Sequence, residues 1–355
     1  MALTDKLVSI ANSIRKQTGG TNDLTLDQMA VEIESIGASK NIFPNGTEWT
    51  QSNMTTGSYE TLYYANGLWV AGGDSGLCYS IDGKTWTQSN VSSECYGCLF
   101  YANGLWVAGS DDENKGLYYS TDGKTWTQSN MTTGYYYALY YANGLWVVAS
   151  KTGLHYSTDG KTWTKSNVTT GKYYALHYAN GLWVAGSSEN KGLYYSTDGK
   201  TWTQSNMTTG YYGALHYANG LWVVNSKTGL YYSTDGKTWT QSNVINSTYT
   251  YSSLYYSNGL WIATSGDGLT SLYYSIDGKT WNANDSIPTI CYTVYNANGI
   301  WIAGCITGIY YSTDGKTWAP SNATGFSAKS IYNANGIWVT TGYGLYYSVT
   351  WEPAV

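Results

Sequence analysis

The chain has 355 residues and a formal net charge of −5, and only 12% of its residues are charged. This mild acidity gives no reason to expect a nucleic-acid partner. Arg15 is the only arginine, which excludes an arginine clamp for carboxylate or phosphate groups from the rest of the chain. No apolar run is long enough for membrane insertion, and residues 1–20 lack the order of a signal peptide. We therefore expect a protein made in a cytoplasm.

Residues 1–43 differ from everything that follows and predict two short helices and a linker. Thr4 can cap the first helix, and Thr25-x-x-Gln28 forms a capping box at the start of the second. Two such helices bury too little surface to be stable alone. They either lie on the domain that follows or, as we favour, form a segment for homo-oligomerisation or attachment to a larger assembly. Their apolar positions are Leu7, Ile10, Ile14, Leu26, Met29, Ile33 and Ile36.

From residue 44 onward the chain is a tandem repeat. An Asp-Gly-Lys-Thr-Trp run occurs seven times, and an Asn-Gly-Leu/Ile-Trp run alternates with it at intervals of 37–40 residues. Repeats of this length indicate a solenoid or a propeller. The aspartates are Asp82, Asp122, Asp159, Asp198, Asp235, Asp277 and Asp314, and the asparagines are Asn66, Asn103, Asn143, Asn180, Asn219, Asn258, Asn298 and Asn335.

Each repeat contains four short strand patterns. Asn143-Gly144 is the dipeptide preferred in a two-residue type I′ hairpin turn between the first two strands. In the second tight turn, the Asp159 carboxylate can accept bonds from backbone N–H groups of its own turn. Both faces of the first hairpin are apolar, so each sheet must be covered on both sides, as a propeller blade is by its neighbours. In this repeat the strands are expected at 138–142, 145–149, 154–157 and 162–166.

Each strand type occurs eight times, provided that residues 47–53 supply the last outer strand. We therefore predict an all-β fold over residues 44–355, an eight-bladed β-propeller of four-stranded blades closed by this N-terminal strand. Pairing of the two chain ends would remove an open sheet edge.

The Ser-Thr-Asp-Gly-Lys-Thr-Trp segments resemble the Asp-box repeat of sialidase-like β-propellers, Ser-x-Asp-x-Gly-x-Thr-Trp, with one residue fewer between Asp and Trp. The resemblance implies that Asp122 and its equivalents are structural and lie on the face away from a ligand. Sialidases of that family hold the substrate carboxylate with three arginines, which the repeats lack, so sialidase activity is excluded. Residues 11–19 and 21–36 are similar to a short leader of tail and surface proteins of phages and prophages of Gram-positive bacteria.

No set of residues predicts catalysis, a metal site or a cofactor. His155, His177 and His216 stand where other repeats carry tyrosine, and we interpret them as structural. Cys95-x-x-Cys98 lacks the second pair that a zinc site needs. All five cysteines are expected to be free thiols: Cys78, Cys95, Cys98, Cys291 and Cys305. A glycosidase-type pair of carboxylates stays open, because the loops carry Glu60, Glu94, Asp111, Asp112, Glu113, Glu189 and Asp267.

The two faces of the predicted disc differ in variability. The two tight turns of each repeat share one face and are nearly identical throughout, whereas the loops of the other face vary and are rich in tyrosine. Such loops suit recognition, and tyrosine rings stack on sugars, although the same rings could instead pack between blades. The candidate ligand-binding residues are Tyr135, Tyr136, Lys172, Tyr173, Tyr211, Tyr212, Tyr249 and Tyr251.

We therefore expect a non-enzymatic component of a phage or prophage particle, such as a tail-tip, fibre or head-decoration protein, located in the virion. Its partners would be a host surface, with a cell-wall glycan as the favoured ligand, and other particle proteins that contact the N-terminal helices. A free lectin or bacterial adhesin is the first alternative, and a degenerate glycan hydrolase is the second.

Overall fold

The computed structural model describes residues 46–93, 95–245, 253–264 and 272–349. The chain divides into two compact units, Met1–Pro44 and Asn45–Val355. All strands named below belong to the second unit, and the two helices expected in residues 1–43 lie outside the described residues. Within the described ranges no helix is long and apolar enough to cross a membrane.

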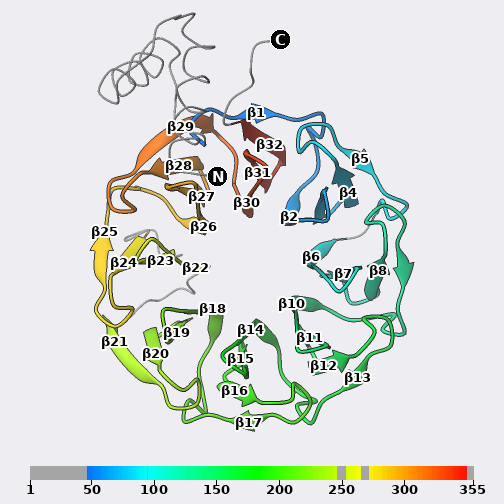
Figure 1. Cartoon of the computed structure of the whole chain (residues 1–355), viewed down its shortest axis with the longest axis vertical. Helices are drawn as coiled ribbons and strands as arrows, with labels where there is room; N and C mark the ends of the chain where they lie inside the picture. The colour runs from blue at the N-terminus through cyan, green and yellow to red at the C-terminus, as the bar shows by residue number, and fades with distance from the viewer. Residues whose placement is uncertain (1–45, 94, 246–252, 265–271, 350–355) are drawn as a thin grey trace, which may run out of the picture. The chain divides into compact units, whose positions relative to one another are not determined.

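The second unit is a ring of eight four-stranded antiparallel sheets, the blades of a β-propeller (Figure 1). The strands nearest the centre are β2 (Tyr59–Ala65), β6 (Tyr96–Ala102), β10 (Tyr136–Ala142), β14 (Tyr173–Ala179), β18 (Tyr212–Ala218), β22 (Leu254–Ser257), β26 (Cys291–Ala297) and β30 (Ile331–Ala334). The second strands are β3 (Leu68–Gly73), β7 (Leu105–Ser110), β11 (Leu145–Ser150), β15 (Leu182–Ser187), β19 (Leu221–Ser226), β23 (Leu260–Thr264), β27 (Ile300–Cys305) and β31 (Ile337–Gly342). The all-β, eight-bladed architecture predicted from the repeats is confirmed.

The outer half of each blade is made of a third and a fourth strand. The third strands are β4 (Gly76–Ser80), β8 (Leu117–Ser120), β12 (Gly153–Ser157), β16 (Leu193–Ser196), β20 (Gly229–Ser233), β24 (Leu272–Ser275), β28 (Gly308–Ser312) and β32 (Gly344–Val349). The outermost strands are β5 (Thr87–Gln88), β9 (Thr127–Gln128), β13 (Thr164–Lys165), β17 (Thr203–Gln204), β21 (Thr240–Ile245), β25 (Asn282–Asn284), β29 (Ala319–Thr324) and β1 (Thr50–Gln51). We number the blades in the order of their innermost strands, so blade 1 begins with β2 and blade 8 with β30.

Blade 8 contains strands from both ends of the repeat region. Its sheet order is β1-β32-β31-β30, with Thr50 opposite Tyr347 and Gln51 opposite Tyr346. Next to β1, the Ser52 N–H donates to the Leu345 carbonyl at 2.8 Å. The outermost place in the last blade is thus taken by a strand that precedes the first blade in the sequence.

The Asn-Gly hairpins have the predicted geometry. Asn143 and Gly144 have φ values of 50° and 75°, the positive angles that a type I′ turn requires. Ala142 lies opposite Leu145. Because the side-chain period of a strand is two, this register puts the leucine and the tryptophan that follow each turn on opposite faces of the sheet.

The hydrophobic core lies between blades. One cluster joins Leu145 and Val147 of blade 3 to Tyr173 and Trp183 of blade 4. Trp183 is 1% exposed, as are the equivalent tryptophans of most other blades. Each sheet therefore needs apolar side chains on both faces, which confirms the prediction that both faces are covered.

The outermost strand is shorter than predicted. Residues 162–166 were expected to form it, but β13 contains Thr164–Lys165 alone. Trp163 leaves the ladder because its N–H donates to Asn130 Oδ1 at 2.8 Å, and its carbonyl accepts a bond from Asn130 Nδ2 at 3.1 Å. Asn130 follows β9 of blade 2, so a contact between blades replaces a contact within the sheet.

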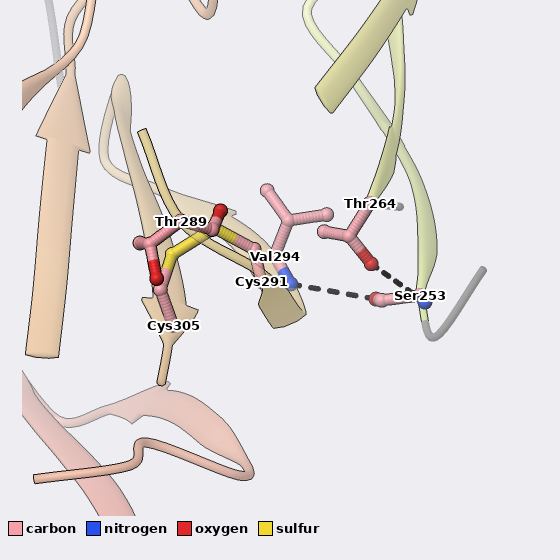
Figure 2. Close-up of a disulfide and its surroundings, with 6 residues drawn as sticks. All are labelled: Ser253, Thr264, Thr289, Cys291, Val294 and Cys305. Carbon is pink, nitrogen blue, oxygen red and sulfur yellow. Dashed lines mark hydrogen bonds between the residues drawn. A yellow bond between two sulfur atoms is a disulfide. The ribbon is translucent and has the colours of Figure 1, made fainter. Parts of the chain in front are cut away.

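Cys291 and Cys305 form a disulfide between β26 and β27 (Figure 2). The prediction of five free thiols is therefore wrong for this pair. The two residues are 14 positions apart in sequence, but the hairpin places them directly opposite each other. The other cysteines that we expected to be free are so in the structure, namely Cys78, Cys95 and Cys98.

Blades 6 and 7 are joined by polar contacts close to this disulfide. The Ser253 N–H donates to Thr264 Oγ1 at 2.9 Å within blade 6, and the Val294 N–H of β26 donates to Ser253 Oγ at 3.4 Å (Figure 2). Thr264 is fully buried, and the bond from the Ser253 N–H gives its hydroxyl a partner inside the protein.

Candidate functional site

On the face of the Asp-Gly-Lys turns, the carboxylates hold the turns themselves. Asp198 Oδ1 accepts bonds from the Lys200 N–H (2.8 Å), the Thr201 N–H (2.7 Å) and Ser196 Oγ (2.9 Å). Partial burial raises the pKa of Asp198, but these bonds outweigh it and hold the pKa below its ordinary value. In the equivalent turn, the same opposing effects leave Asp159 with a pKa of about 2. The predicted structural role of these aspartates agrees with this geometry.

The other residues of the motif bind the preceding blade. Lys200 Nζ lies 5.5 Å from the centroid of the Tyr156 ring in blade 3, a cation–π contact. The Trp202 N–H donates to Asn167 Oδ1 at 2.8 Å, and the Trp202 carbonyl accepts from Asn167 Nδ2 at 2.9 Å. Asn167 follows β13, so it fastens blade 3 to blade 4. This role was not predicted from the sequence, although a Ser-Asn dipeptide follows the turn in most repeats.

A second set of side chains forms a closed circle from blade to blade. Each innermost strand contributes one aromatic ring, and neighbouring centroids are 4.8–5.7 Å apart. Each ring also packs edge-on against a tryptophan, as Tyr140 does against Trp183 at 6.0 Å. We call this set the inner ring: Tyr63, Phe100, Tyr140, His177, His216, Tyr255, Tyr295 and Tyr332.

Two histidines belong to this inner ring. Burial lowers the pKa of His177 to about 3, with a further effect from His216, and burial lowers the pKa of His216 to about 4. His155 of β12 is 1% exposed, and burial lowers its pKa to about 4. All three imidazoles are therefore neutral at pH 7, and their packing supports the structural interpretation.

The opposite face has a constant backbone and variable side chains. We call it the loop face; it comprises the loops that precede the innermost strands and those that join the second strand to the third. The two kinds of loop are joined by one recurring N–H···O=C bond, such as Lys151 to Tyr135 (3.1 Å). The side chains at this bond vary, and only blades 3 and 5 share a pair, lysine with tyrosine. The six pairs are Asp74 and Ser58, Asp111 and Cys95, Lys151 and Tyr135, Ser188 and Lys172, Lys227 and Tyr211, Ile306 and Ile290.

Three of the candidate ligand-binding tyrosines are packed between blades. Tyr136, Tyr173 and Tyr212 are each 1% exposed, so their rings offer no surface to a ligand. The Tyr136 hydroxyl also donates to the Thr133 carbonyl at 2.7 Å. These three residues begin their strands, where the chain turns into the core.

The other described candidates lie at the surface of the loop face. Lys151 Nζ lies 4.4 Å from the centroid of the Tyr135 ring, and Lys227 Nζ lies 4.2 Å from that of Tyr211. Lys172 forms an ion pair with Glu189 at 3.4 Å. Tyr249 and Tyr251 lie outside the described residues.

The structure adds a group of residues that the sequence analysis missed. These residues stand three positions before the members of the inner ring, and three neighbouring pairs of them are in contact across a blade boundary. Tyr137 and Tyr174 stack with centroids 3.9 Å apart and planes at 14°, and Lys329 lies over the ring of Tyr292 at 4.4 Å. We call this set the mouth ring, and its described members are Glu60, Gly97, Tyr137, Tyr174, Gly213, Tyr292 and Lys329. The available signal was variability, because this position differs more between repeats than its neighbours do.

Carboxylates cluster at the blade 1 and blade 2 side of the mouth ring. Burial raises the pKa of Asp111, and the charge of Glu60 raises it further. Glu60 is itself paired with Lys329 at 4.0 Å, and Cys95 Sγ donates to Asp74 at 3.3 Å. Across the described ranges, no group of three or more His, Cys, Asp or Glu is placed to hold a metal ion.

One cavity of about 450 Å³ lies on the turn face, at the seam between blades 1 and 2. Tyr79, Ile81, Asp82 and Lys124 line it. Lys124 is engaged with the Tyr79 ring at 5.5 Å, and Asp82 holds its own turn through the Lys84 N–H at 2.9 Å. Because its polar groups already have these partners, we regard the cavity as a gap between blades.

Neither a protein-family model nor a curated protein matches the sequence. Solved structures do share its fold. The chain is similar to the computationally designed Ika8 protein (TM-score 0.68, 12% identity, covering 86% of this chain and 100% of that one). It is also similar to BamB from Moraxella catarrhalis, with a TM-score of 0.62 and 10% identity over 85% of this chain and 98% of that one. YCF48 from Cyanidioschyzon merolae has a TM-score of 0.54 and 13% identity over 85% of this chain and 98% of that one. At these identities the likeness shows the propeller fold alone.

Proposed function

We propose that this protein is a non-enzymatic component of a phage or prophage particle, which recognises a host surface glycan through its loop face. The observation that carries the proposal is the contrast between the two faces. On the turn face the same polar groups make the same bonds from blade to blade. On the loop face a backbone bond that recurs in six blades presents five different pairs of side chains, and rigid scaffolds commonly carry binding residues on such variable loops.

The choice of a glycan rests on the kind of side chain that is exposed. Three tyrosines of the loop face, Tyr174, Tyr211 and Tyr343, are 41%, 37% and 63% exposed. A tyrosine face provides a flat apolar surface for a sugar ring, and its hydroxyl can bond to sugar hydroxyl groups. Lysines and carboxylates around these rings would add hydrogen bonds that select one sugar over another.

A binding measurement with matched variants tests which face recognises the host. Tyr211→Ala removes an exposed ring from the loop face, and Lys200→Met removes a charge from the turn face. We expect the first variant to lose retention on purified host cell walls and the second to bind like the wild type. A loss with Lys200→Met alone would show that the turn face is the recognition face.

The assignment to a particle rests on residues 1–43, whose apolar stripes require a partner surface and whose sequence resembles a phage leader. Light scattering of the full-length chain and of residues 41–355 should give a larger assembly for the former alone. Immunogold labelling of purified particles would distinguish a virion component from a free lectin or adhesin, which would leave the particles unlabelled. Release of reducing ends from the bound cell walls would instead favour a glycan hydrolase.

We also propose that the pairing of β1 with β32 closes the ring and holds the two ends of the propeller together. Two observations support this proposal. Thr50 pairs with Tyr347 in the sheet of blade 8, and the Trp49 N–H donates to Asn322 Oδ1 of blade 7 at 2.7 Å. The Trp49 carbonyl also accepts a bond from Asn322 Nδ2 at 3.2 Å, so these contacts have the same form as those between Asn167 and Trp202.

A further inference from the structure

Two histidines stand next to each other in the inner ring, one on each of two neighbouring blades. His177 belongs to β14 of blade 4 and His216 to β18 of blade 5, and their ring centroids are 5.4 Å apart. Two imidazoles that share one tetrahedral metal ion, with metal–nitrogen bonds of about 2.0–2.1 Å, have centroids roughly 5 Å apart. The two side chains are therefore close enough to bind the same ion.

The side chains of the inner ring converge on the axis of the propeller. Burial raises the pKa of Tyr63 to about 12, with further effects from other tyrosines that include Tyr140 and Tyr295. These two lie in blades 3 and 7, and each is two blades away from Tyr63 in blade 1. Since electrostatic effects weaken with distance, an interaction across two blades indicates that the hydroxyl groups point toward the axis, where the blades come closest together. His177 and His216 occupy the equivalent position.

The nitrogens of these two imidazoles are accessible and unpaired. Neither His177 nor His216 forms a hydrogen bond with any residue that the structure describes, and both side chains are only partly buried. Both ring nitrogens of His155 are buried without a partner, whereas those of His177 and His216 keep contact with solvent. The two rings are neutral at pH 7, and neutral imidazole is the form that binds a metal ion.

We propose that His177 and His216 together bind one divalent transition-metal ion, such as Cu²⁺ or Zn²⁺, at the inner edge of blades 4 and 5. Imidazole suits these ions, and Cu²⁺ binds a given set of nitrogen ligands more tightly than Zn²⁺ does. Water molecules complete the coordination. The ion links β14 to β18 and so adds a bond between two blades to their apolar contacts. This site does not depend on the proposed glycan recognition.

Each histidine has a replacement that the fold already accepts, because tyrosine occupies the equivalent position in blades 1, 3, 6, 7 and 8. His177→Tyr and His216→Tyr should therefore fold like the wild type. Changes outside the ligands themselves already cost about 10–100-fold in metal affinity, so we expect loss of either ligand to weaken copper binding by about tenfold or more. His155→Tyr is the matched control, since its nitrogens are enclosed and tyrosine is native at the equivalent Tyr194. It should leave copper binding unchanged.

Isothermal titration of the untagged, chelator-treated, full-length protein with CuSO4, ZnCl2 and MgCl2 measures the affinities. Electron paramagnetic resonance of the copper-loaded protein reports whether nitrogen atoms are ligands. One copper ion per chain with nitrogen couplings, weaker zinc binding and no magnesium binding support the site. Absence of saturable copper binding, or of nitrogen couplings, overturns it. Copper binding that is unchanged in His177→Tyr or in His216→Tyr also overturns it, because other groups would then hold the ion.

Discussion

Replacing Asp198 with alanine removes three hydrogen bonds from one turn of blade 4: those from the Lys200 N–H, the Thr201 N–H and Ser196 Oγ. A hydrogen bond contributes about 0.5–1.5 kcal/mol net to stability, and more where one partner is charged. Both backbone donors lie at the exposed surface, so water can replace part of what is lost. We expect the free energy of unfolding to fall by about 1–2 kcal/mol.

Urea denaturation followed by tryptophan fluorescence measures this change, with Asp112→Ala as the matched control. Asp112 also accepts a backbone bond, from the Asn114 N–H at 2.9 Å, but its side chain bonds only to Asn114 within its own loop. Its removal should cost less than about 0.5 kcal/mol. Glycan binding should be unchanged in Asp198→Ala, because the residue lies on the turn face.

The pH dependence provides a second check on the same carboxylate. Since the folded pKa of Asp198 lies below its ordinary value, its contribution is fully present above pH 4 and is lost as pH falls through the folded pKa. The difference between wild type and Asp198→Ala should therefore shrink below pH 4. Equal stabilities of Asp198→Ala and Asp112→Ala at pH 7 would refute the structural role of Asp198. Loss of glycan binding in Asp198→Ala at an unchanged stability would show that the turn face is the recognition face.

Other perturbations test the remaining contacts. Deleting residues 1–54 should lower the melting temperature far more than deleting residues 1–40, because the first deletion alone removes β1; equal melting temperatures would contradict ring closure. Asn167→Ala should destabilise by about 1–3 kcal/mol in urea denaturation, since it breaks both bonds between blades 3 and 4, and a neutral result would refute the clasp. Because the folded pKa values of His177 and His216 are depressed, stability should fall as pH drops from about 6.5 toward 4, by about 1.4 kcal/mol per pH unit for each imidazole. Replacing both histidines with tyrosine, the residue at this position in most other blades, should remove their contribution to the pH dependence of stability. Urea denaturation at pH 7 and pH 5 measures this change.

The repeats were sufficient to predict the blades, because the signals that form a hairpin are local. Asn143 and Gly144 tolerate positive φ wherever they occur together, so the turn and the register of β10 and β11 follow from adjacent residues. The Asp159 carboxylate likewise binds N–H groups two and three residues away. Apolar side chains on both sheet faces then required neighbouring blades, which led to the propeller.

Contacts between blades were decided by the tertiary structure, because they join residues more than 30 positions apart through the pseudo-symmetry of the ring. Asn130 and Trp163 fasten two blades, yet neither sequence position specifies the other. Adjacent tyrosines also separate: Tyr136 is buried, whereas Tyr135 lies under a surface lysine. Strand alternation gives two faces, but which of them is buried depends on where the neighbouring blade lies.

The candidate site shows the same division. Variability identified the loop face and Tyr211, but the stacked pair of Tyr137 and Tyr174 was not anticipated, since the two belong to different blades. Only the arrangement of the blades in a ring brings these two rings to stacking distance, because 37 residues separate them in the sequence.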